Sequence, residues 1–285
     1  MSENDLIQHV SDTSIWIAAY RAMETARPDA IFKDPQAARL AGDKGMQMVS
    51  ATPNAKAMGF AMAMRTSAID RLIHLAISRG VDTVINLGAG LDSRPYRMQL
   101  PAHLKWIEVD FPKIIDYKTE ILKEEKPVCS LQRIACDLSL QMERLELFTR
   151  LDAAAKRTLI ITEGVIAYIT NDQAAQLSKD LYSIPSFQYW IQDYRFGKYR
   201  NSKRSERLQK ILKNTPFRFD VENPVTFFNQ HGWKMVKNIF LLEEADTVGR
   251  KIPLKFSYKI VMKFFGKKFR DIINKSYGFV LFGKE

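Results

Sequence analysis

Cysteine and histidine are both scarce in this chain of 285 residues, which contains two cysteines and four histidines. The cysteines, Cys129 and Cys136, are too few for a disulfide framework and too isolated for a zinc site. The histidines are scattered without metal-ligand spacing, so no metal site is assigned. These shortages argue against a disulfide-stabilised secreted domain and favour a reducing, cytoplasmic setting.

Long apolar runs are missing as well. No uninterrupted apolar stretch approaches the roughly 18 residues that indicate a membrane span. The polar start, Met1 to Ser14, lacks the basic and apolar regions of a signal peptide. With 46% hydrophobic and 26% charged residues, the composition is that of a globular protein with a large core.

Acidic residues are outnumbered, with 32 Asp and Glu against 43 Lys and Arg and a formal net charge of +11. The excess is concentrated in residues 250–275, which hold nine basic residues and one acidic residue. This segment predicts a basic amphipathic helix, because lysines recur every four residues and Pro253 suits a helix start. Two interpretations stay open: the helix packs on the domain with its lysines in water, or it docks a carrier protein or an anionic surface.

Short apolar clusters alternate with longer amphipathic stretches along most of the chain. Because strands separated by helices imply crossover connections, the pattern predicts an α/β fold with a doubly wound, mostly parallel sheet. The expected strands are 82–88, 104–110, 128–138, 157–164, 187–194, 232–241 and 276–283, and the expected helices between them are 110–125, 140–156 and 171–183, with Asn171 and Asp172 as a helix cap.

The first eighty residues do not follow this alternation. Residues 12–42 and 55–80 predict helices, and both precede the first strand. They must therefore pack on or over the sheet. We expect one domain over residues 1–285, with an N-terminal helical cap over residues 1–80 that acts as a lid.

The stretch VINLGAGLDSRPYR, residues 84–97, runs from the first strand into a glycine-rich turn. Gly88 and Gly90 suit close backbone approach to a ligand, but Ser93 stands where a dinucleotide-binding turn has its third glycine. Acidic residues end the following strands: Asp110, Asp137 and Glu163. In a parallel sheet these strand ends line one crevice, and acids there suit an adenosine whose tail is positive and carries no phosphate. S-adenosylmethionine fits this pattern better than a phosphorylated dinucleotide.

Five motifs together carry a family resemblance: RTSAID, NLGAGLDSRPYR, WIEVDFPKIIDYK, CDL and TEGVIAYIT. In order and spacing they resemble the leucine carboxyl methyltransferase family, including bacterial members that methylate polyketide-type small molecules, as in tetracenomycin biosynthesis. The resemblance covers about Ser11 to Tyr194 well. It implies a class I S-adenosylmethionine-dependent methyltransferase fold, Rossmann-like, with about seven strands and a reversed final strand.

The resemblance also implies roles for individual residues toward S-adenosylmethionine. Arg65 would pair with the methionine carboxylate, and Glu163 would contact the cofactor near the methionine moiety. Gly88 would allow the close backbone approach, and Asp110 would hold the ribose. The adenine would be contacted by the side chain of Asp137 and the backbone amide of Leu138.

The acceptor side is less defined. A phenol or alcohol acceptor needs a general base, whereas a carboxylate is ionised at neutral pH and needs a positive or hydrogen-bonding cradle. No histidine lies in the motifs, which favours O-methylation of a carboxylate on a small acidic molecule over methylation of a hydroxyl group. The expected substrate-side residues are Tyr168 and Arg21, with Tyr20, Tyr194 and Arg195 as further candidates.

The sequence lacks the motifs of nucleic-acid methyltransferases. Amino-base methylation usually needs an Asp/Asn-Pro-Pro-aromatic loop after the fourth strand, where this chain has TEGVIAY, and base C5 methylation needs a cysteine there. No specific nucleic-acid partner is therefore expected. The protein-directed family members use an N-terminal lysine that neither Arg21 nor Lys33 clearly matches, although carboxyl methylation of a protein C-terminus stays an alternative. A cofactor-binding protein without turnover is the non-enzymatic alternative. The sequence does not determine the oligomeric state.

Overall fold

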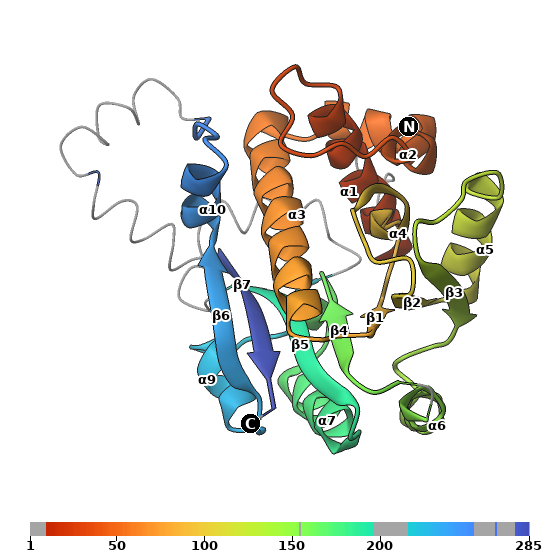
Figure 1. The fold of residues 1–285 in the computed structure, drawn as a ribbon. Coiled ribbons are helices and arrows are strands. Elements are labelled where there is room, and N and C mark those ends of the chain that lie inside the picture. Colours follow the sequence, from red (N-terminus) through yellow and green to blue (C-terminus); the bar gives the residue numbers. More distant parts are fainter. Residues whose placement is uncertain (1–9, 154, 196–215, 254–265, 267–276, 285) are drawn as a thin grey trace.

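A computed structural model describes residues 10–153, 155–195, 216–253, 266 and 277–284 (Figure 1). Within them, seven strands form one sheet in the order β3-β2-β1-β4-β5-β7-β6. Strands β1 to β5 pair in parallel, and β7 lies antiparallel between β5 and β6. The strands are β1 (Thr83–Leu87), β2 (Lys105–Asp110), β3 (Ser130–Ala135), β4 (Thr158–Thr162), β5 (Phe187–Arg195), β6 (Lys234–Phe240) and β7 (Tyr277–Gly283). The expected sheet, including its reversed final strand, is confirmed.

Helices connect and cover the strands. Those that precede the sheet are α1 (Val10–Thr25), α2 (Ala37–Ser50) and α3 (Ala55–Ser78). The others are α4 (Arg94–Arg97), α5 (Pro112–Ile121), α6 (Gln141–Asp152), the 3-10 turn η2 (Ile166–Tyr168), α7 (Asn171–Ser183), α9 (Pro224–Asn229) and α10 (Leu241–Thr247). Helix α7 is capped by Thr170, whose side chain accepts from the Gln173 N–H while the Gln173 side chain bonds back to Thr170. The cap expected at Asn171 and Asp172 therefore lies one residue earlier.

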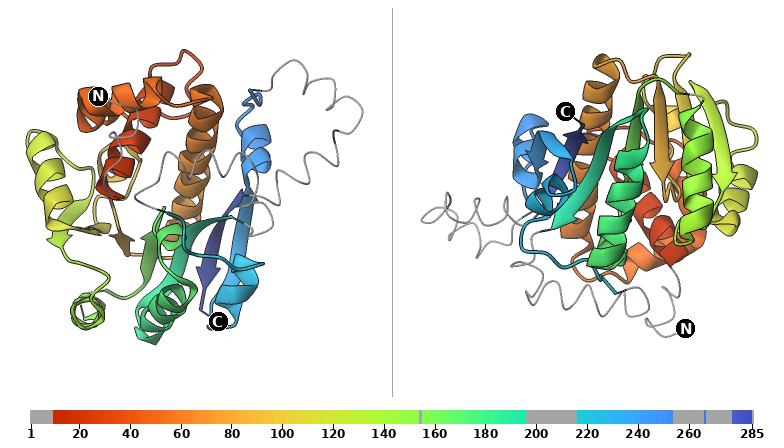
Figure 2. Two further views of the ribbon diagram at one scale, coloured as in Figure 1. Left: turned by 180° about the vertical axis from the view of Figure 1, so that it is seen from behind. Right: turned by 90° about the horizontal axis from the view of Figure 1, so that it is seen from below.

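The central strands are buried on both faces, because their successive side chains point in opposite directions and helices cover each face. Val84 and Leu159 pack toward α3 and α10, whereas Ile85 and Ile160 pack toward α6, α7 and α9. Figures 1 and 2 show α3 on one face of the sheet and α7 on the other. All five residues of β1 and of β4 are buried, as expected for central strands of a parallel sheet.

Helices α1 and α2 form a third layer against α3. Trp16, Tyr20 and Leu40 are buried there together with Met62 of α3. Lys44 of α2 also forms an ion pair with Asp12 of α1. Figure 1 shows this layer beside α4, near the edge of the sheet where the first glycine turn lies. The helical cap expected from the sequence thus consists of α1 to α3, and the structure places α1 beside the glycine turn.

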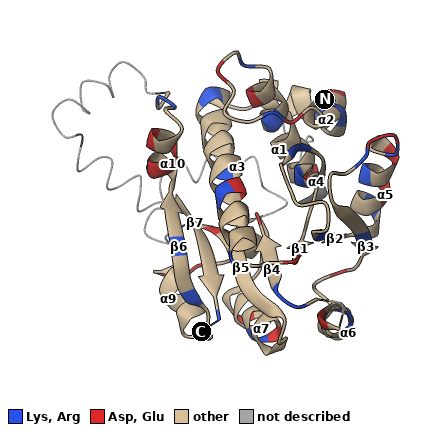
Figure 3. Cartoon of the chain, viewed as in Figure 1, with Lys and Arg blue, Asp and Glu red and all other residues tan. Residues whose placement is uncertain are grey.

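Charged side chains of both signs are interspersed over the described helices, for example on α5, and α10 is acidic (Figure 3). The segment predicted to carry the basic helix is described only at residues 250–253 and 266. The predicted helix and its docking role therefore lie outside the described residues. In the part of the chain that the structure covers, no helix combines the length and apolar character needed to cross a membrane.

Candidate active site

A cavity of about 570 Å³ opens at the carboxyl ends of the parallel strands. Its walls come from the turn after β1, the ends of β2, β4 and β5, and helix α1. The volume lies within the range of small-molecule sites, and the strand ends of an open parallel sheet are where such folds bind ligands. The cavity is lined by all nine residues singled out from the sequence for the site: Arg21, Arg65, Gly88, Gly90, Asp110, Asp137, Leu138, Glu163 and Tyr168.

The glycine turn is packed too closely to carry side chains. Gly88 has φ +69°, and a Cβ there would lie 2.5 Å from a methyl group of Val165. Gly90 has φ +50°, and its Cβ would lie 3.1 Å from the Cβ of Ser14 in α1. Glycine adopts this left-handed conformation without steric cost, so both positions let backbone line the cavity.

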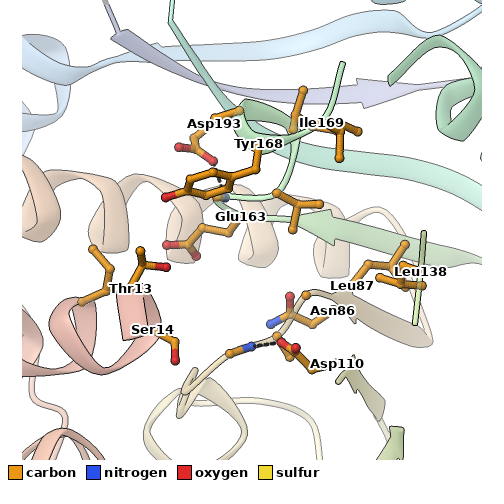
Figure 4. Close-up of a pocket in the computed structure, with 18 of the residues that line it drawn as sticks. Thr13, Ser14, Asn86, Leu87, Asp110, Leu138, Glu163, Tyr168, Ile169 and Asp193 are labelled. Carbon is orange, nitrogen blue, oxygen red and sulfur yellow. Dashed lines mark hydrogen bonds between the residues drawn. The ribbon is translucent and has the colours of Figure 1, made fainter. Parts of the chain in front are cut away.

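Asp110 holds this turn from the end of β2. One carboxylate oxygen accepts a hydrogen bond of 2.6 Å from the Gly90 N–H, and the other accepts one of 2.7 Å from the Phe111 N–H. Figure 4 shows the first of these bonds, with Asn86 beside it. Burial raises the pKa of Asp110, although the two backbone N–H groups favour its ionised form. The oxygens keep further lone pairs for hydroxyl donors.

Glu163 lies at the centre of an ion-pair network above the ends of β1 and β4. One oxygen is 2.7 Å from Arg65 Nε, and the other is 2.8 Å from Arg94 Nη1. Arg94 also pairs with Asp92 and Asp70, at 2.8 and 2.7 Å. Burial opposes ionisation of Glu163, but the guanidinium groups of Arg94 and Arg65 hold its pKa below the usual value.

Asp193, near the end of β5, completes the surroundings of Arg65. Its carboxylate lies 3.6 Å from Arg65 Nη1, accepts the Gly164 N–H at 2.7 Å and accepts the Tyr277 hydroxyl at 2.8 Å. Gly164 has φ +70°, and a Cβ there would lie 2.8 Å from the Arg65 guanidinium. Figure 4 shows Asp193, Glu163 and Tyr168 gathered on one side of the cavity.

The loop after β3 forms the opposite end of the cavity. A carboxylate oxygen of Asp137 accepts hydrogen bonds from the Ser139 N–H at 2.9 Å and from the Ser139 hydroxyl at 2.7 Å. Arg144 of α6 donates to the Leu138 carbonyl at 2.6 Å and forms an ion pair with Asp180. The loop conformation is therefore fixed by Ser139 and Arg144, which line the cavity themselves.

The predicted substrate-side residues differ in their position and in their contacts with other residues. Tyr168 lies in the cavity near Thr13 of α1, and burial raises the pKa of its hydroxyl (Figure 4). Arg21 lines the cavity, but it pairs with Asp34 at 2.7 Å and donates to the Leu91 carbonyl at 2.5 Å. Tyr20 was a further candidate and is not among the cavity residues, because it packs against Trp16 between α1 and the neighbouring helices.

Several cavity residues were not singled out from the sequence. Asp92 and Arg94 are two of them, and Arg94 forms ion pairs with Asp92, Glu163 and Asp70. Asp193 follows the same strand-end pattern as Asp110 and could have been found from it. Tyr277 gave no signal, because its contact with Asp193 depends on pairing between β5 and β7.

Comparisons with known proteins agree with this architecture. Residues 14–181 match the leucine carboxyl methyltransferase family. A Streptomyces coelicolor protein named as an S-adenosyl-L-methionine-dependent methyltransferase is 33% identical over 169 residues, which are 56% of this chain and 60% of that protein. A Rhodococcus jostii protein named in the same way is 28% identical over 274 residues, 87% of this chain and 90% of that protein.

Solved structures support the fold. A DUF574 family protein from Streptomyces avermitilis superimposes with a TM-score of 0.58 at 12% identity, covering 94% of this chain and 97% of its own. A structure of a Thermobifida fusca protein described as a methyltransferase gives a TM-score of 0.57 at 11% identity, covering 99% and 97%. The chain belongs to the leucine carboxyl methyltransferase family, whose members are S-adenosylmethionine-dependent methyltransferases with the class I fold.

Proposed function

We propose that this chain transfers a methyl group from S-adenosylmethionine to a carboxylate oxygen of a small acidic molecule, such as a polyketide-type acid. The observation that carries the proposal is the set of titratable groups in the cavity. No histidine occurs among the described residues that line it, and its tyrosines Tyr168, Tyr194 and Tyr277 have raised pKa values because they are buried. These tyrosines stay protonated at neutral pH and are unsuited to act as a general base. An acceptor that is already ionised fits such a cavity.

The residues present suit the cofactor. The neighbouring Arg65 and Glu163 form a pair of opposite charges, complementary to the carboxylate and ammonium groups of an amino-acid tail. Gly88 presents only backbone to the cavity, which suits close approach of a ligand. Asp110 retains lone pairs for ribose hydroxyl groups, and Asp137 and Leu138 lie at the far end for the adenine.

When bound, S-adenosylmethionine supplies a methyl group on positively charged sulfur: the acceptor oxygen forms an O–C bond as the S–C bond breaks, and neutral S-adenosylhomocysteine leaves. This chain's contribution is positioning and exclusion of water. Helix α1 brings Thr13, Ser14 and Trp16 over the cavity, and Arg21 braces that helix against the turn through Leu91. No proton has to move when the acceptor is a carboxylate.

Labelled methyl transfer to a panel of small carboxylic acids and matched phenols tests the proposal. We expect label in products that release methanol on mild alkaline treatment, as methyl esters do and aryl methyl ethers do not. Alkali-stable label from the phenols alone would replace the proposal with hydroxyl methylation. Cofactor binding without transfer to any acceptor, including a peptide with a free C-terminus, would support the non-enzymatic alternative.

A further inference from the structure

Arginine supplies the cationic side chains among the described residues that line the cavity, and one arginine differs from the rest. Arg21, Arg65, Arg94 and Arg144 each form an ion pair with an aspartate or a glutamate. Arg195 forms no ion pair with any described residue, and it is exposed. Because the described residues neutralise four of these cations and not the fifth, Arg195 is suited to bind a negatively charged group of a ligand.

Aromatic rings hold Arg195 in place. Its guanidinium carbon lies 5.3 Å from the ring centroid of Phe217 and 5.3 Å from that of Tyr277. Tyr277 is there because Arg195 and Tyr277 are direct partners in the antiparallel pairing of β5 and β7. Cation–π contacts of this kind use the faces of the rings and consume none of the guanidinium N–H donors. Arg195 is therefore oriented, yet its planar fork stays available for a carboxylate.

The neighbouring wall of the cavity is also aromatic. The ring centroids of Tyr168 and Phe217 lie 5.4 Å apart. Phe217 therefore contacts both Tyr168 of η2 and the Arg195 guanidinium group. Backbone hydrogen bonds from Arg218 and Phe219 to the Ala167 carbonyl fix Phe217 beside Tyr168. Flat rings next to a free guanidinium group form a surface suited to a planar, unsaturated body that carries an anionic group.

We propose that Arg195 anchors the anionic group of the methyl acceptor and that Tyr168 and Phe217 contact an aromatic or conjugated body attached to it. This inference rests on the proposed function and narrows its acceptor to unsaturated acids. Arg195 is assigned a substrate-binding role. Arg195 selects acceptors that carry a negative charge, and the rings of Tyr168 and Phe217 select acceptors with a flat body.

The experiment is a calorimetric titration of 2-naphthoate into the full chain saturated with S-adenosylhomocysteine. Neutral 2-naphthamide and saturated cyclohexanecarboxylate serve as matched probes. Removing one partner of a charged hydrogen bond weakens binding by about ten- to a hundredfold, so Arg195→Gln should have that effect on 2-naphthoate. Arg195→Lys should recover part of the affinity. The same charge change in Arg218→Gln, one residue from Phe217 and outside the cavity lining, should have no effect.

Each outcome decides the proposal. Loss of affinity confined to the anionic probes supports the role of Arg195, and tighter binding of 2-naphthoate than of cyclohexanecarboxylate supports the aromatic wall. Equal affinity of 2-naphthoate for the wild type and Arg195→Gln overturns the anchor, as does failure of the wild type to bind any carboxylate. An equal loss of affinity for the neutral 2-naphthamide in Arg195→Gln would indicate that the substitution changed the shape of the cavity, and it would also overturn the anchor.

The proposed function is tested separately, because these titrations need no turnover. Carboxyl methylation that is unchanged in Arg195→Gln would overturn the anchor and leave the proposed function standing. Arg195-dependent binding of 2-naphthoate, without transfer of methyl to any carboxylate, would overturn carboxyl methylation and leave the anion site in place.

Discussion

The two ends of the cavity are built in opposite ways. At the cofactor end, Arg65, Arg94 and Glu163 are largely buried and satisfy one another through ion pairs. At the acceptor end, Arg195 is exposed, and among the described residues it makes two cation–π contacts and no ion pair. The match to the family spans residues 14–181, so it includes the first end and stops before Arg195. A saturated network is rigid and costly to alter. An exposed cation with no ion pair in the described part of the chain is available to a substrate and costs little to replace.

The largest expected effect is on stability at the cofactor end. Arg94→Met removes the cation shared by Asp92, Asp70 and Glu163. Glu163 keeps Arg65 and Asp70 keeps Arg97, but the buried Asp92 loses the one ion pair that it forms among the described residues. Breaking a buried ion pair in this way costs about 3–5 kcal/mol of unfolding free energy. Arg39→Met, which breaks an exposed pair with Glu125, should cost about 0–1 kcal/mol. Urea unfolding of both variants measures the contrast, and equal losses would remove the distinction between the two kinds of pair.

The next effect concerns cofactor affinity. Asp110→Ala removes a carboxylate that fixes the Gly90 and Phe111 amides and that we assign to the ribose. Loss of such a charged hydrogen-bond partner should cost about 1.5–3 kcal/mol, which is roughly ten- to a hundredfold in affinity. Calorimetry with S-adenosylmethionine measures it, with Arg218→Gln as the control. Wild-type affinity in Asp110→Ala would refute the assignment of Asp110.

The pH dependence of stability is the third test. Burial opposes ionisation of Asp92 and Glu163, but nearby guanidinium groups lower both pKa values in the folded state. The resulting stabilisation is complete above the unfolded values of about 4 and is lost as the pH falls further. Arg94→Met removes the cation that lowers both pKa values most, so its deficit relative to the wild type should shrink below about pH 4, by about 1.4 kcal/mol for each unit of pKa shift removed. Unfolding free energies between pH 3 and 7 measure this, and a deficit independent of pH would contradict it.

The smallest expected effect is at Tyr277, which contacts residues at both ends of the cavity. The hydroxyl of Tyr277 donates to Asp193 at the cofactor end, and its ring contacts Arg195 at the acceptor end. Tyr277→Phe keeps the ring and should cost about 1 kcal/mol of stability. Tyr277→Leu also removes the ring and should weaken 2-naphthoate binding more than Tyr277→Phe does. Equal affinities in the two variants would show that the ring does not orient Arg195.

Much of the fold followed from local pattern. The expected strands 82–88 and 157–164 contain β1 and β4, because buried strands of a parallel sheet form continuous apolar runs. The short helices α9 and α10 were not predicted, since six or seven residues are too few to show helical periodicity. The burial of Lys118 of α5 was also not predicted, because it depends on an ion pair with Glu108 of β2. A charged residue reveals its sign in the sequence, but not its partner.

The sequence by itself determined the glycine turn and the acids at the strand ends, and therefore the end of the cavity that we assign to the cofactor. It could do so because a parallel sheet brings the carboxyl ends of its strands to one edge, whatever the details of packing. Only the tertiary structure decided which cavity arginines are neutralised and which one has no ion-pair partner among the described residues. That choice depends on the pairing of β5 with β7 and on the contact of Phe217 with Tyr168, and both join segments that are distant in the chain. The acceptor end is therefore a property of register and packing, which local sequence pattern does not encode.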